Sequence, residues 1–246
     1  MTDAKNVIVT GAAGGIGSAV CKRLADDGYR VAALDLDEPG LAALKDQLGS
    51  AVDVYPVDQT REEDVRVLVA QIEREQGSVS ALANVLGWTG GTRFDQETSG
   101  YWNKVVALNY LSLLYVVHPV LTAMIARKRG KMVFVASDAG RSGASGQAVY
   151  AGAKGAVIAF AKSLARENAR HNITVNCVAP GPTETPLFRH EQAEHPELVD
   201  RIVKAIPLRR AALPAEQAAA VSFLLSPDAD YITGQTLSVS GGLSMV

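Results

Sequence analysis

The sequence of 246 residues predicts an α/β fold, a single domain with a doubly wound parallel sheet of about seven strands and helices on both faces. Three observations predict it. Short runs that are apolar on both faces alternate with helical patterns of about ten residues or more, as in a parallel sheet covered on both sides. The hydrophobic fraction of 48% is ample for a buried core. No linker, repeat or low-complexity segment divides the chain, so residues 1–246 are expected to form one domain.

The expected strands follow one another along the whole chain. They cover residues 7–10, 31–35, 52–57, 81–86, 131–137, 173–179 and 236–240. The two longest helical patterns lie near residues 101–128 and 148–170. Right-handed crossovers bring the carboxyl ends of parallel strands to one edge of the sheet, which is where ligands of such folds bind. Functional side chains are therefore expected just beyond the strand ends.

A glycine-rich turn over residues 10–17 follows the first strand and opens a helix. Gly11 permits the tight turn, Gly15 lets backbone amides approach a pyrophosphate, and Gly17 allows close helix packing. The helix N-terminus, which begins around Ile16, favours negative charge. A purely structural turn would use the same glycines, but the strand before it and the helix after it favour a Rossmann-type dinucleotide site.

Two acidic residues at strand ends bear on the choice of cofactor. Asp35 ends the second strand, where its carboxylate can accept hydrogen bonds from the ribose 2′-hydroxyl of NAD and would repel the 2′-phosphate of NADP. At about 4 Å, like charges repel by roughly 1 to 4 kcal/mol. The sequence therefore predicts NAD. Asp58 follows the third strand and would either bond the adenine amino group or cap the helix that begins near Arg61.

Three residues in the second half of the chain can make a proton-transfer site. Tyr150 and Lys154 lie four residues apart in an alanine-rich helical pattern, so they share one helix face. An ammonium beside a phenol favours the phenolate and lowers its pKa from about 10, which would let Tyr150 act as a base near neutrality. Ser137 ends the fifth expected strand and would hold a substrate oxygen. Taken alone, the Tyr–Lys pair is also consistent with an ordinary helix surface.

In their order, these residues resemble the short-chain dehydrogenase/reductase family over essentially the whole chain. Residues 10–17 are similar to its glycine turn; Asn109, Ser137, Tyr150 and Lys154 match its catalytic tetrad; Pro180, Gly181, Thr183 and Thr185 match its nicotinamide segment; and residues 232–242 resemble its last strand. The resemblance implies a dinucleotide-binding half near residues 1–90 and a catalytic half over residues 91–246. One departure lies after the fourth strand, where Asn84-Val85-Leu86-Gly87 replaces the family's Asn-Asn-Ala-Gly. In the family, an asparagine of this segment stabilises the central strand. Asn84 is expected to keep only part of that role and to lie near the cofactor.

The resemblance implies an oxidoreductase mechanism. Tyr150 removes the alcohol proton while a hydride passes to the nicotinamide, and Ser137 orients the oxygen. Lys154 lowers the pKa of the tyrosine and bonds the nicotinamide ribose. Asn109 holds a water that links Lys154 to solvent, although an asparagine at this position could instead bond nearby backbone.

Substrate choice is expected to depend on the lid and the loops around it. Residues 136–140, 165–171, 204–208 and 237–243 are similar to family members that oxidise 2-hydroxycyclohexanecarboxyl-CoA. The lid is predicted over residues 182–200, and the candidate pocket residues are Trp88, Ser137, Gln147, Leu187 and Phe188. Four basic residues could meet CoA phosphates or form a solvated face: Arg189, Lys204, Arg209 and Arg210. The alternatives are a reductase for 3-oxoacyl thioesters on a carrier protein, a dehydrogenase of free secondary alcohols, and a non-catalytic dinucleotide-binding protein.

Composition argues against other partners and compartments. The formal net charge of −2 provides no basic face for nucleic acid or for a membrane surface. No apolar run is expected to span a membrane, and the few residues before the first strand leave no room for an export signal, so a cytoplasmic enzyme is predicted. Cys21 and Cys177 lack metal or redox spacing, and His190 and His195 do not share a helix face, so no catalytic metal is expected. Family resemblance implies a homotetramer.

Overall fold

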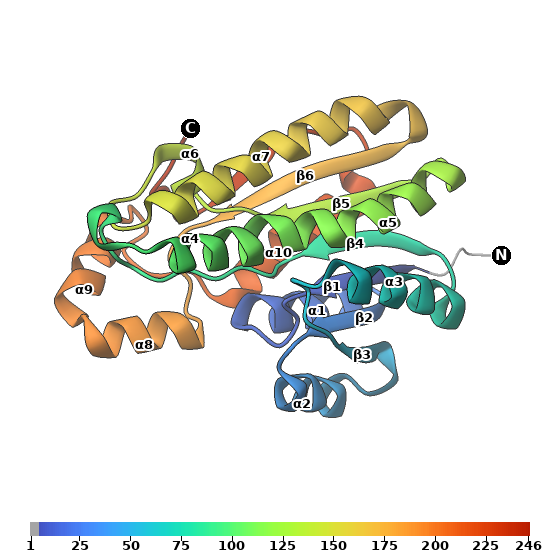
Figure 1. Ribbon diagram of the computed structural model, residues 1–246, viewed down its shortest axis with the longest axis horizontal. Helices are drawn as coiled ribbons and strands as arrows, with labels where there is room; N and C mark the ends of the chain where they lie inside the picture. Colours follow the sequence, from blue (N-terminus) through green and yellow to red (C-terminus); the bar gives the residue numbers. More distant parts are fainter. Residues whose placement is uncertain (1–4) are drawn as a thin grey trace.

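The computed structural model describes residues 5–246 and contains one seven-stranded sheet in the order β3-β2-β1-β4-β5-β6-β7 (Figure 1). All strand pairs are parallel. The sequence predicts no export signal before the first strand. Residues 1–4 of that stretch lie outside the described residues. Helices cover both faces, which confirms the predicted fold class.

Every expected strand is present. The bounds are β1 (Asn6–Thr10), β2 (Arg30–Asp35), β3 (Val52–Pro56), β4 (Val79–Asn84), β5 (Gly130–Val135), β6 (Ile173–Pro180) and β7 (Thr236–Val239). The strand β4 begins and ends two residues earlier than expected, and β5 ends two residues before Ser137. Ser137 therefore lies in the loop beyond the carboxyl end of β5, rather than in the strand itself.

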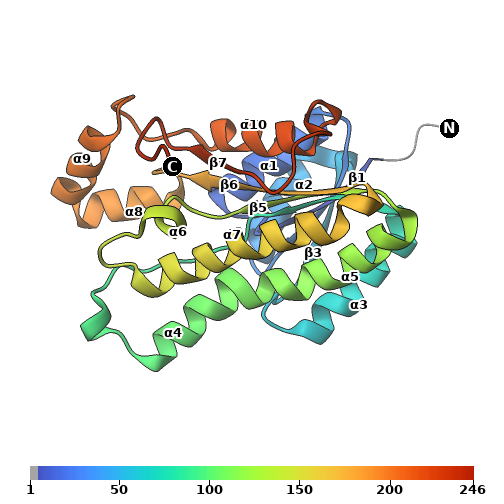
Figure 2. The same cartoon turned by 90° about the horizontal axis from the view of Figure 1, so that it is seen from above.

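The helices form one layer on each side of the sheet, as Figure 2 shows. One layer consists of α1 (Gly15–Asp26), α2 (Glu38–Leu48) and α10 (Pro214–Leu225), and the other of α3 (Glu62–Gln76), α4 (Ser99–Val106), α5 (Ser112–Arg127) and α7 (Ala148–Asn168). Each layer packs on the sheet through its own hydrophobic cluster. In α7, Ala153, Val157, Ala161 and Leu164 are buried at spacings of three or four, so one apolar stripe faces the sheet.

A third group of helices lies at the carboxyl edge of the sheet. The short α6 (Ala139–Ser142) follows the Ser137 loop, and α8 (Pro186–Glu194) and α9 (Pro196–Ala205) follow β6. Figure 1 shows α8 and α9 projecting beyond the strands at the end of the molecule opposite the start of β1. The segment expected to be a lid is therefore a pair of helices.

The helical stretch Ser99–Arg127 corrects one expectation. Among residues 5–246 it is the one helix long and apolar enough to cross a membrane by length and composition. It includes α4, α5 and a π-helical turn, Ala107–Leu111, between them. Its apolar side chains Leu113, Val116 and Val120 are fully buried against the sheet, so it is a core helix of this fold.

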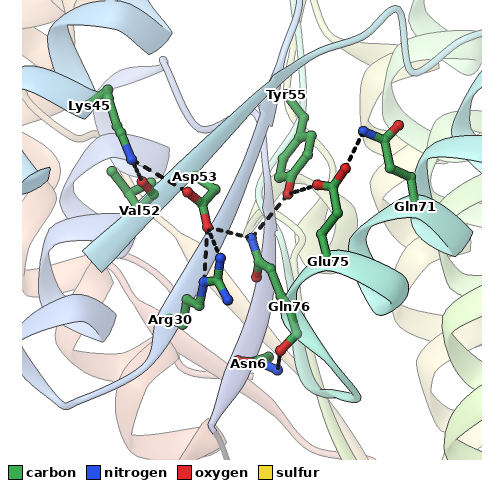
Figure 3. Close-up of polar contacts among 9 residues, drawn as sticks. All are labelled: Asn6, Arg30, Lys45, Val52, Asp53, Tyr55, Gln71, Glu75 and Gln76. Atoms are coloured by element: carbon green, nitrogen blue, oxygen red, sulfur yellow. Dashed lines mark hydrogen bonds and ion pairs between the residues drawn. The ribbon is translucent and has the colours of Figure 1, made fainter. Parts of the chain in front are cut away.

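A polar network ties the edge strand β3 to its neighbours (Figure 3). The Asp53 carboxylate accepts hydrogen bonds from Arg30 Nε at 2.9 Å and Gln76 Nε2 at 3.1 Å, and it pairs with Lys45 Nζ at 3.4 Å. Tyr55 donates its hydroxyl to Glu75 at 2.9 Å. These contacts join β2, β3, α2 and α3 near the amino ends of the strands. They leave the carboxyl ends of the strands free for a site.

Candidate active site

The glycine turn between β1 and α1 has the geometry that only glycine allows. Gly11 has φ +63°, and its backbone oxygen accepts a hydrogen bond from Gly14 N at 3.2 Å. A Cβ at Gly17 would lie 1.9 Å from that oxygen, and a Cβ at Gly15 would lie 2.8 Å from Thr185 Cγ2. The turn is therefore packed against the start of α8, and the N-cap of α1, Gly14, provides no side-chain hydrogen bond of its own. An anion at this helix N-terminus would meet backbone amides.

Asp35 is held beside the glycine turn. Its carboxylate accepts hydrogen bonds from the backbone amides of Ala13 at 2.9 Å and Asp37 at 3.1 Å. The first of these amides belongs to the glycine turn, so the position of the carboxylate is fixed relative to that turn. The end of β2 therefore presents a localised negative charge where a dinucleotide would place its adenosine ribose.

Asp58 does not cap α3. Its Oδ1 accepts hydrogen bonds from the Thr60 amide at 2.9 Å and the Thr60 hydroxyl at 2.6 Å. The Thr60 hydroxyl and amide lower the pKa of Asp58. The helix begins at Glu62, and Arg61 occupies its N-cap position, so the capping alternative for Asp58 is wrong and the carboxylate stabilises a turn before the helix.

Asn84 joins the ends of two central strands. Its buried Oδ1 accepts a hydrogen bond from the Thr10 hydroxyl at 2.9 Å. The Thr10 oxygen in turn accepts from the amides of Val85 at 3.0 Å and Leu86 at 3.2 Å. Sequence reasoning gave Thr10 no role. The signals for it were its place as the last residue of the first strand and its position at the start of the glycine turn.

Ser137, Tyr150 and Lys154 meet at the carboxyl edge of the sheet. Tyr150 shares a hydrogen bond with Ser137, which joins the first turn of α7 to the loop after β5. Lys154 is 2% exposed and donates from Nζ to Val135 O at 2.9 Å. Its Nζ lies 5.8 Å from the centroid of the Tyr150 ring. The three predicted residues therefore occupy one corner, with the lysine behind the tyrosine.

The electrostatics of this corner differ from the expectation. Burial raises the pKa of Tyr150, and the hydrogen bond to Ser137 opposes that rise. Burial also lowers the pKa of Lys154 to about 8. The spacing predicted that Lys154 would lower the pKa of Tyr150. In the protein without cofactor, the withdrawal of both groups from water outweighs that effect.

Asn109 bonds the backbone, which was the alternative to a water-holding role. It lies in the π-helical turn, where its Oδ1 accepts from Trp88 N at 3.1 Å and its Nδ2 donates to Trp88 O at 2.7 Å and Val105 O at 2.8 Å. A Cβ on Gly87 would lie 3.0 Å from Asn109 Oδ1 and 2.9 Å from Lys154 Nζ. Asn109 and Lys154 thus flank the same glycine, and π-turns of this kind are frequent at functional sites.

The segment after β6 connects the two ends of the site. The Pro180 carbonyl lies 3.5 Å from the Asp138 amide, in the Ser137 loop. Thr185 caps α8 by accepting from Phe188 N at 3.2 Å and packs against Gly15. A dinucleotide that runs from the glycine turn to Tyr150 would therefore pass along residues 180–185.

The candidate substrate residues lie on separate segments around the carboxyl edge of the sheet. Trp88 packs edge-on against Tyr101, with ring centroids 5.8 Å apart, and carries Lys104 Nζ 3.9 Å above its ring. Gln147 is the N-cap residue of α7, and Leu187 and Phe188 lie in α8. Tyr101 and Lys104 were not predicted, and their spacing in an amphipathic helix gave no signal for contact with Trp88.

Three of the four basic residues suggested for CoA phosphates have local partners. Lys204 pairs with Asp200 at 2.6 Å, Arg210 pairs with Glu216 at 2.6 Å, and Arg209 donates to the Lys204 backbone carbonyl. These contacts favour a solvated face at those positions. The fourth residue, Arg189, is exposed on α8.

Comparison with known proteins agrees with this architecture. The family model described as enoyl-(acyl carrier protein) reductase matches residues 11–244. The acetoacetyl-CoA reductase of Acinetobacter sp. (strain RA3849) is 38% identical over 100% of both chains, and the 3-oxoacyl-(acyl-carrier-protein) reductase of Vibrio cholerae is 36% identical over 99% of both. The chain belongs to the short-chain dehydrogenase/reductase family. A crystal structure of a variant actinorhodin polyketide ketoreductase with NADPH superposes with a TM-score of 0.94, at 34% identity, over 99% of this chain and 98% of that one.

Membership of this family establishes an oxidoreductase that uses a nicotinamide dinucleotide. The residues fit such a cofactor. Gly15 leaves no room for a side chain beside Thr185, so the turn presents backbone there; α1 begins without a side-chain cap, and Asp35 stands at the adjacent strand end. The glycine turn would hold the pyrophosphate, and residues 180–185 would hold the nicotinamide half.

The buried Lys154 predicts a pH-dependent stability. Burial lowers its pKa from an ordinary 10.5 to about 8, so below pH 8 its charge disfavours the folded state by about 3 kcal/mol. Between pH 8 and 10.5 the unfolded chain binds more protons than the folded chain, so this penalty disappears as the pH rises. We expect Lys154→Met to be more stable than the wild type at pH 7, and the difference to shrink towards pH 10.5 in urea unfolding without cofactor.

Lys162→Met supplies the control, because Lys162 is exposed on the same helix. It is expected to show no difference from the wild type that changes with pH. A Lys154→Met protein less stable than the wild type at pH 7 would show that the Val135 hydrogen bond outweighs the cost of the buried charge.

Proposed function

We propose that this protein is an NAD-dependent dehydrogenase of a secondary alcohol carried on an acyl thioester, with 2-hydroxycyclohexanecarboxyl-CoA as its substrate. The observation that carries the proposal is the corner of Ser137, Tyr150 and Lys154, which residues 180–185 connect to a glycine turn with Asp35 beside it. This arrangement joins proton transfer to cofactor binding at one edge of the sheet.

The chain's own residues have defined tasks in this reaction. Ser137 donates to the substrate oxygen and holds it next to the Tyr150 phenol oxygen. As the phenolate, Tyr150 takes the alcohol proton during oxidation, and the resulting hydroxyl returns that proton during reduction. Lys154 keeps its ammonium behind the tyrosine, anchored on Val135 O. The bound cofactor supplies the hydride acceptor, and the positive charge of its oxidised form would lower the raised pKa of Tyr150.

Asp35 supports NAD as the cofactor. Its carboxylate is fixed by the Ala13 and Asp37 amides, so it cannot turn away from a 2′-phosphate without giving up both hydrogen bonds. The next residues, Leu36-Asp37-Glu38, provide no arginine to neutralise such a phosphate. The related ketoreductase was crystallised with NADPH, so family membership alone does not choose between the two cofactors.

The names of the relatives support an acyl thioester substrate. Acetoacetyl-CoA and 3-oxoacyl-(acyl-carrier-protein) are both oxoacyl thioesters. They also favour the second candidate, reduction of a 3-oxoacyl thioester. Asp35 argues against it, because biosynthetic reduction usually draws on NADPH. A non-catalytic dinucleotide-binding role is disfavoured by the presence of Ser137, Tyr150 and Lys154 in one corner.

The test is a panel of initial rates with NAD and, separately, NADP. The substrates are 2-hydroxycyclohexanecarboxyl-CoA, 3-hydroxybutyryl-CoA, free 2-hydroxycyclohexanecarboxylic acid and cyclohexanol. We expect NAD reduction with the cyclic CoA ester at least tenfold faster than with either free alcohol. A faster rate with 3-hydroxybutyryl-CoA and NADP would establish the second candidate, and activity on free alcohols alone would refute the thioester assignment.

We further propose that the enzyme is a cytoplasmic homotetramer that acts on a small molecule, with no nucleic acid or membrane as a partner. Apolar side chains are exposed on β7 and beyond it, among them Leu237 at 43%, Met245 at 85% and Val246 at 71%. A second copy would cover them. Light scattering after size-exclusion chromatography tests this, and a mass near 26 kDa, that of one chain of 25.9 kDa, would refute it.

A further inference from the structure

Gln217 joins three segments behind the active site. It lies in the first turns of α10 and is 0% exposed. Its Nε2 donates to the Thr183 hydroxyl at 3.1 Å and to Val239 O, near the end of β7, at 2.9 Å. The Thr183 hydroxyl donates in turn to Gly181 O at 2.9 Å. One amide therefore connects α10, β7 and the segment after β6.

The direction of these hydrogen bonds is fixed. The single hydroxyl proton of Thr183 is used on Gly181 O, so Thr183 accepts from Gln217, and the Val239 carbonyl can only accept. The Gln217 amide nitrogen must face both partners. Its Oε1 is left buried without a hydrogen-bond partner among residues 5–246, which is unfavourable. The fold keeps this amide although one of its atoms is unsatisfied.

The segment that Gln217 holds lies at the centre of the site. Residues 181–185 run from the end of β6 to Thr185, which touches Gly15 and caps the lid helix α8. On its other side the segment pairs with Ala212, through Ala212 N to Pro182 O and Glu184 N to Ala212 O, both at 2.9 Å. The Gln217–Thr183 contact fixes the same segment from behind.

We propose that Gln217 is a positioning residue that holds residues 181–185 in the conformation that receives the nicotinamide half of the cofactor. The inference rests on the nicotinamide placement of the proposed function. Without Gln217, the segment would have to be ordered on binding, and that cost would weaken contacts made by the nicotinamide half. The adenosine half, at the glycine turn and Asp35, would be unaffected.

The experiment compares two ligands on one variant. Gln217→Met keeps the side-chain size and removes both hydrogen bonds. Isothermal titration calorimetry with NADH and with ADP-ribose, which lacks the nicotinamide, measures each half. We expect NADH to bind about tenfold more weakly and ADP-ribose within about twofold of the wild type, since about tenfold matches the loss of one or two hydrogen bonds. An equal loss for both ligands, or no loss for either, would overturn the proposal.

Gln76 provides a matched control near the amino ends of the strands, at the end of the sheet opposite the site (Figure 3). It is also buried, at 7% exposure, and its Nε2 donates to Asp53 at 3.1 Å and Tyr55 at 3.3 Å, while its Oε1 also has no hydrogen-bond partner in the described part of the chain. Gln76→Met is expected to lower the melting temperature as Gln217→Met does, but to leave both affinities unchanged. A Gln76→Met protein with the same selective loss of NADH binding would overturn the positioning role.

Thr183→Val tests the contact from its other side. It removes the oxygen that Gln217 bonds, so we expect the same selective loss of NADH affinity, and a double variant with Gln217→Met no weaker than the larger single effect. Additive losses would contradict a shared mechanism. Because binding needs no turnover, these results do not depend on the substrate assignment. If the enzyme prefers NADPH, the two ligands to titrate are NADPH and 2′-phospho-ADP-ribose.

Discussion

Tyr150→Phe is expected to lower kcat for NAD reduction by about 10²- to 10⁴-fold, the usual contribution of a general acid or base. The variant removes the hydroxyl that bonds Ser137 and keeps the ring that packs near Lys154. The proton of the substrate alcohol then has no acceptor within the corner. NADH affinity, measured by fluorescence titration, should stay within about twofold, because the glycine turn and Asp35 are untouched.

Tyr29→Phe is the matched control for this result. Tyr29→Phe also loses one hydrogen bond, to Leu225 O at 3.1 Å, at a half-buried position that joins α10 to the loop between α1 and β2. We expect its kcat to equal that of the wild type. If Tyr150→Phe instead turns over at the wild-type rate while binding NADH, the proton passes through another group, and the assignment of Tyr150 is wrong.

The fold could be predicted because its signal is local and repeated. Seven apolar runs alternate with helical patterns, and all seven became strands. The boundaries were less accurate at β4 and β5, because residues just beyond a buried strand can also be apolar. The sequence did not predict that the helix Ser99–Arg127 is long enough to cross a membrane. Charged and polar residues at its start interrupt the apolar run, but the helix continues through a π-turn.

The residues at the site could be predicted because a parallel sheet brings distant strand ends together. Ser137 and Tyr150 share a hydrogen bond, as their chemistry suggested. Their electrostatics could not be predicted, because spacing does not report burial. The four-residue separation placed Lys154 near Tyr150 but did not show that the lysine would be 2% exposed and bonded to Val135 O. Desolvation therefore dominates both pKa values.

Polar residues that bond the backbone behind the site were also beyond sequence reasoning. Asn109 was found through a family motif, but its contacts with Trp88 depend on a π-turn that no residue pattern announces. Gln217 gave a weak signal, as an amide that begins an otherwise apolar stretch of alanines and valine. Only the structure shows that its partners are Thr183 and Val239 O.

Asp35→Ser is expected to shift the preference from NAD towards NADP by about tenfold to a thousandfold in the ratio of kcat/KM values. The range follows from a repulsion of roughly 1 to 4 kcal/mol between the carboxylate and a 2′-phosphate. Removing the charge lowers KM for NADP. Losing an acceptor for the ribose 2′-hydroxyl raises KM for NAD, so both changes act in the same direction.

Asp46→Ser separates this local effect from a change in net charge. Asp46 is exposed on α2, away from the strand end, and its replacement removes the same charge from the same half of the molecule. We expect its cofactor preference to match the wild type. A shift of equal size in both variants would mean that the long-range field chooses the cofactor. An unchanged preference in Asp35→Ser would show that the carboxylate held by Ala13 and Asp37 does not face the ribose. A large shift in Asp35→Ser alone would assign the choice to direct contact at the end of β2.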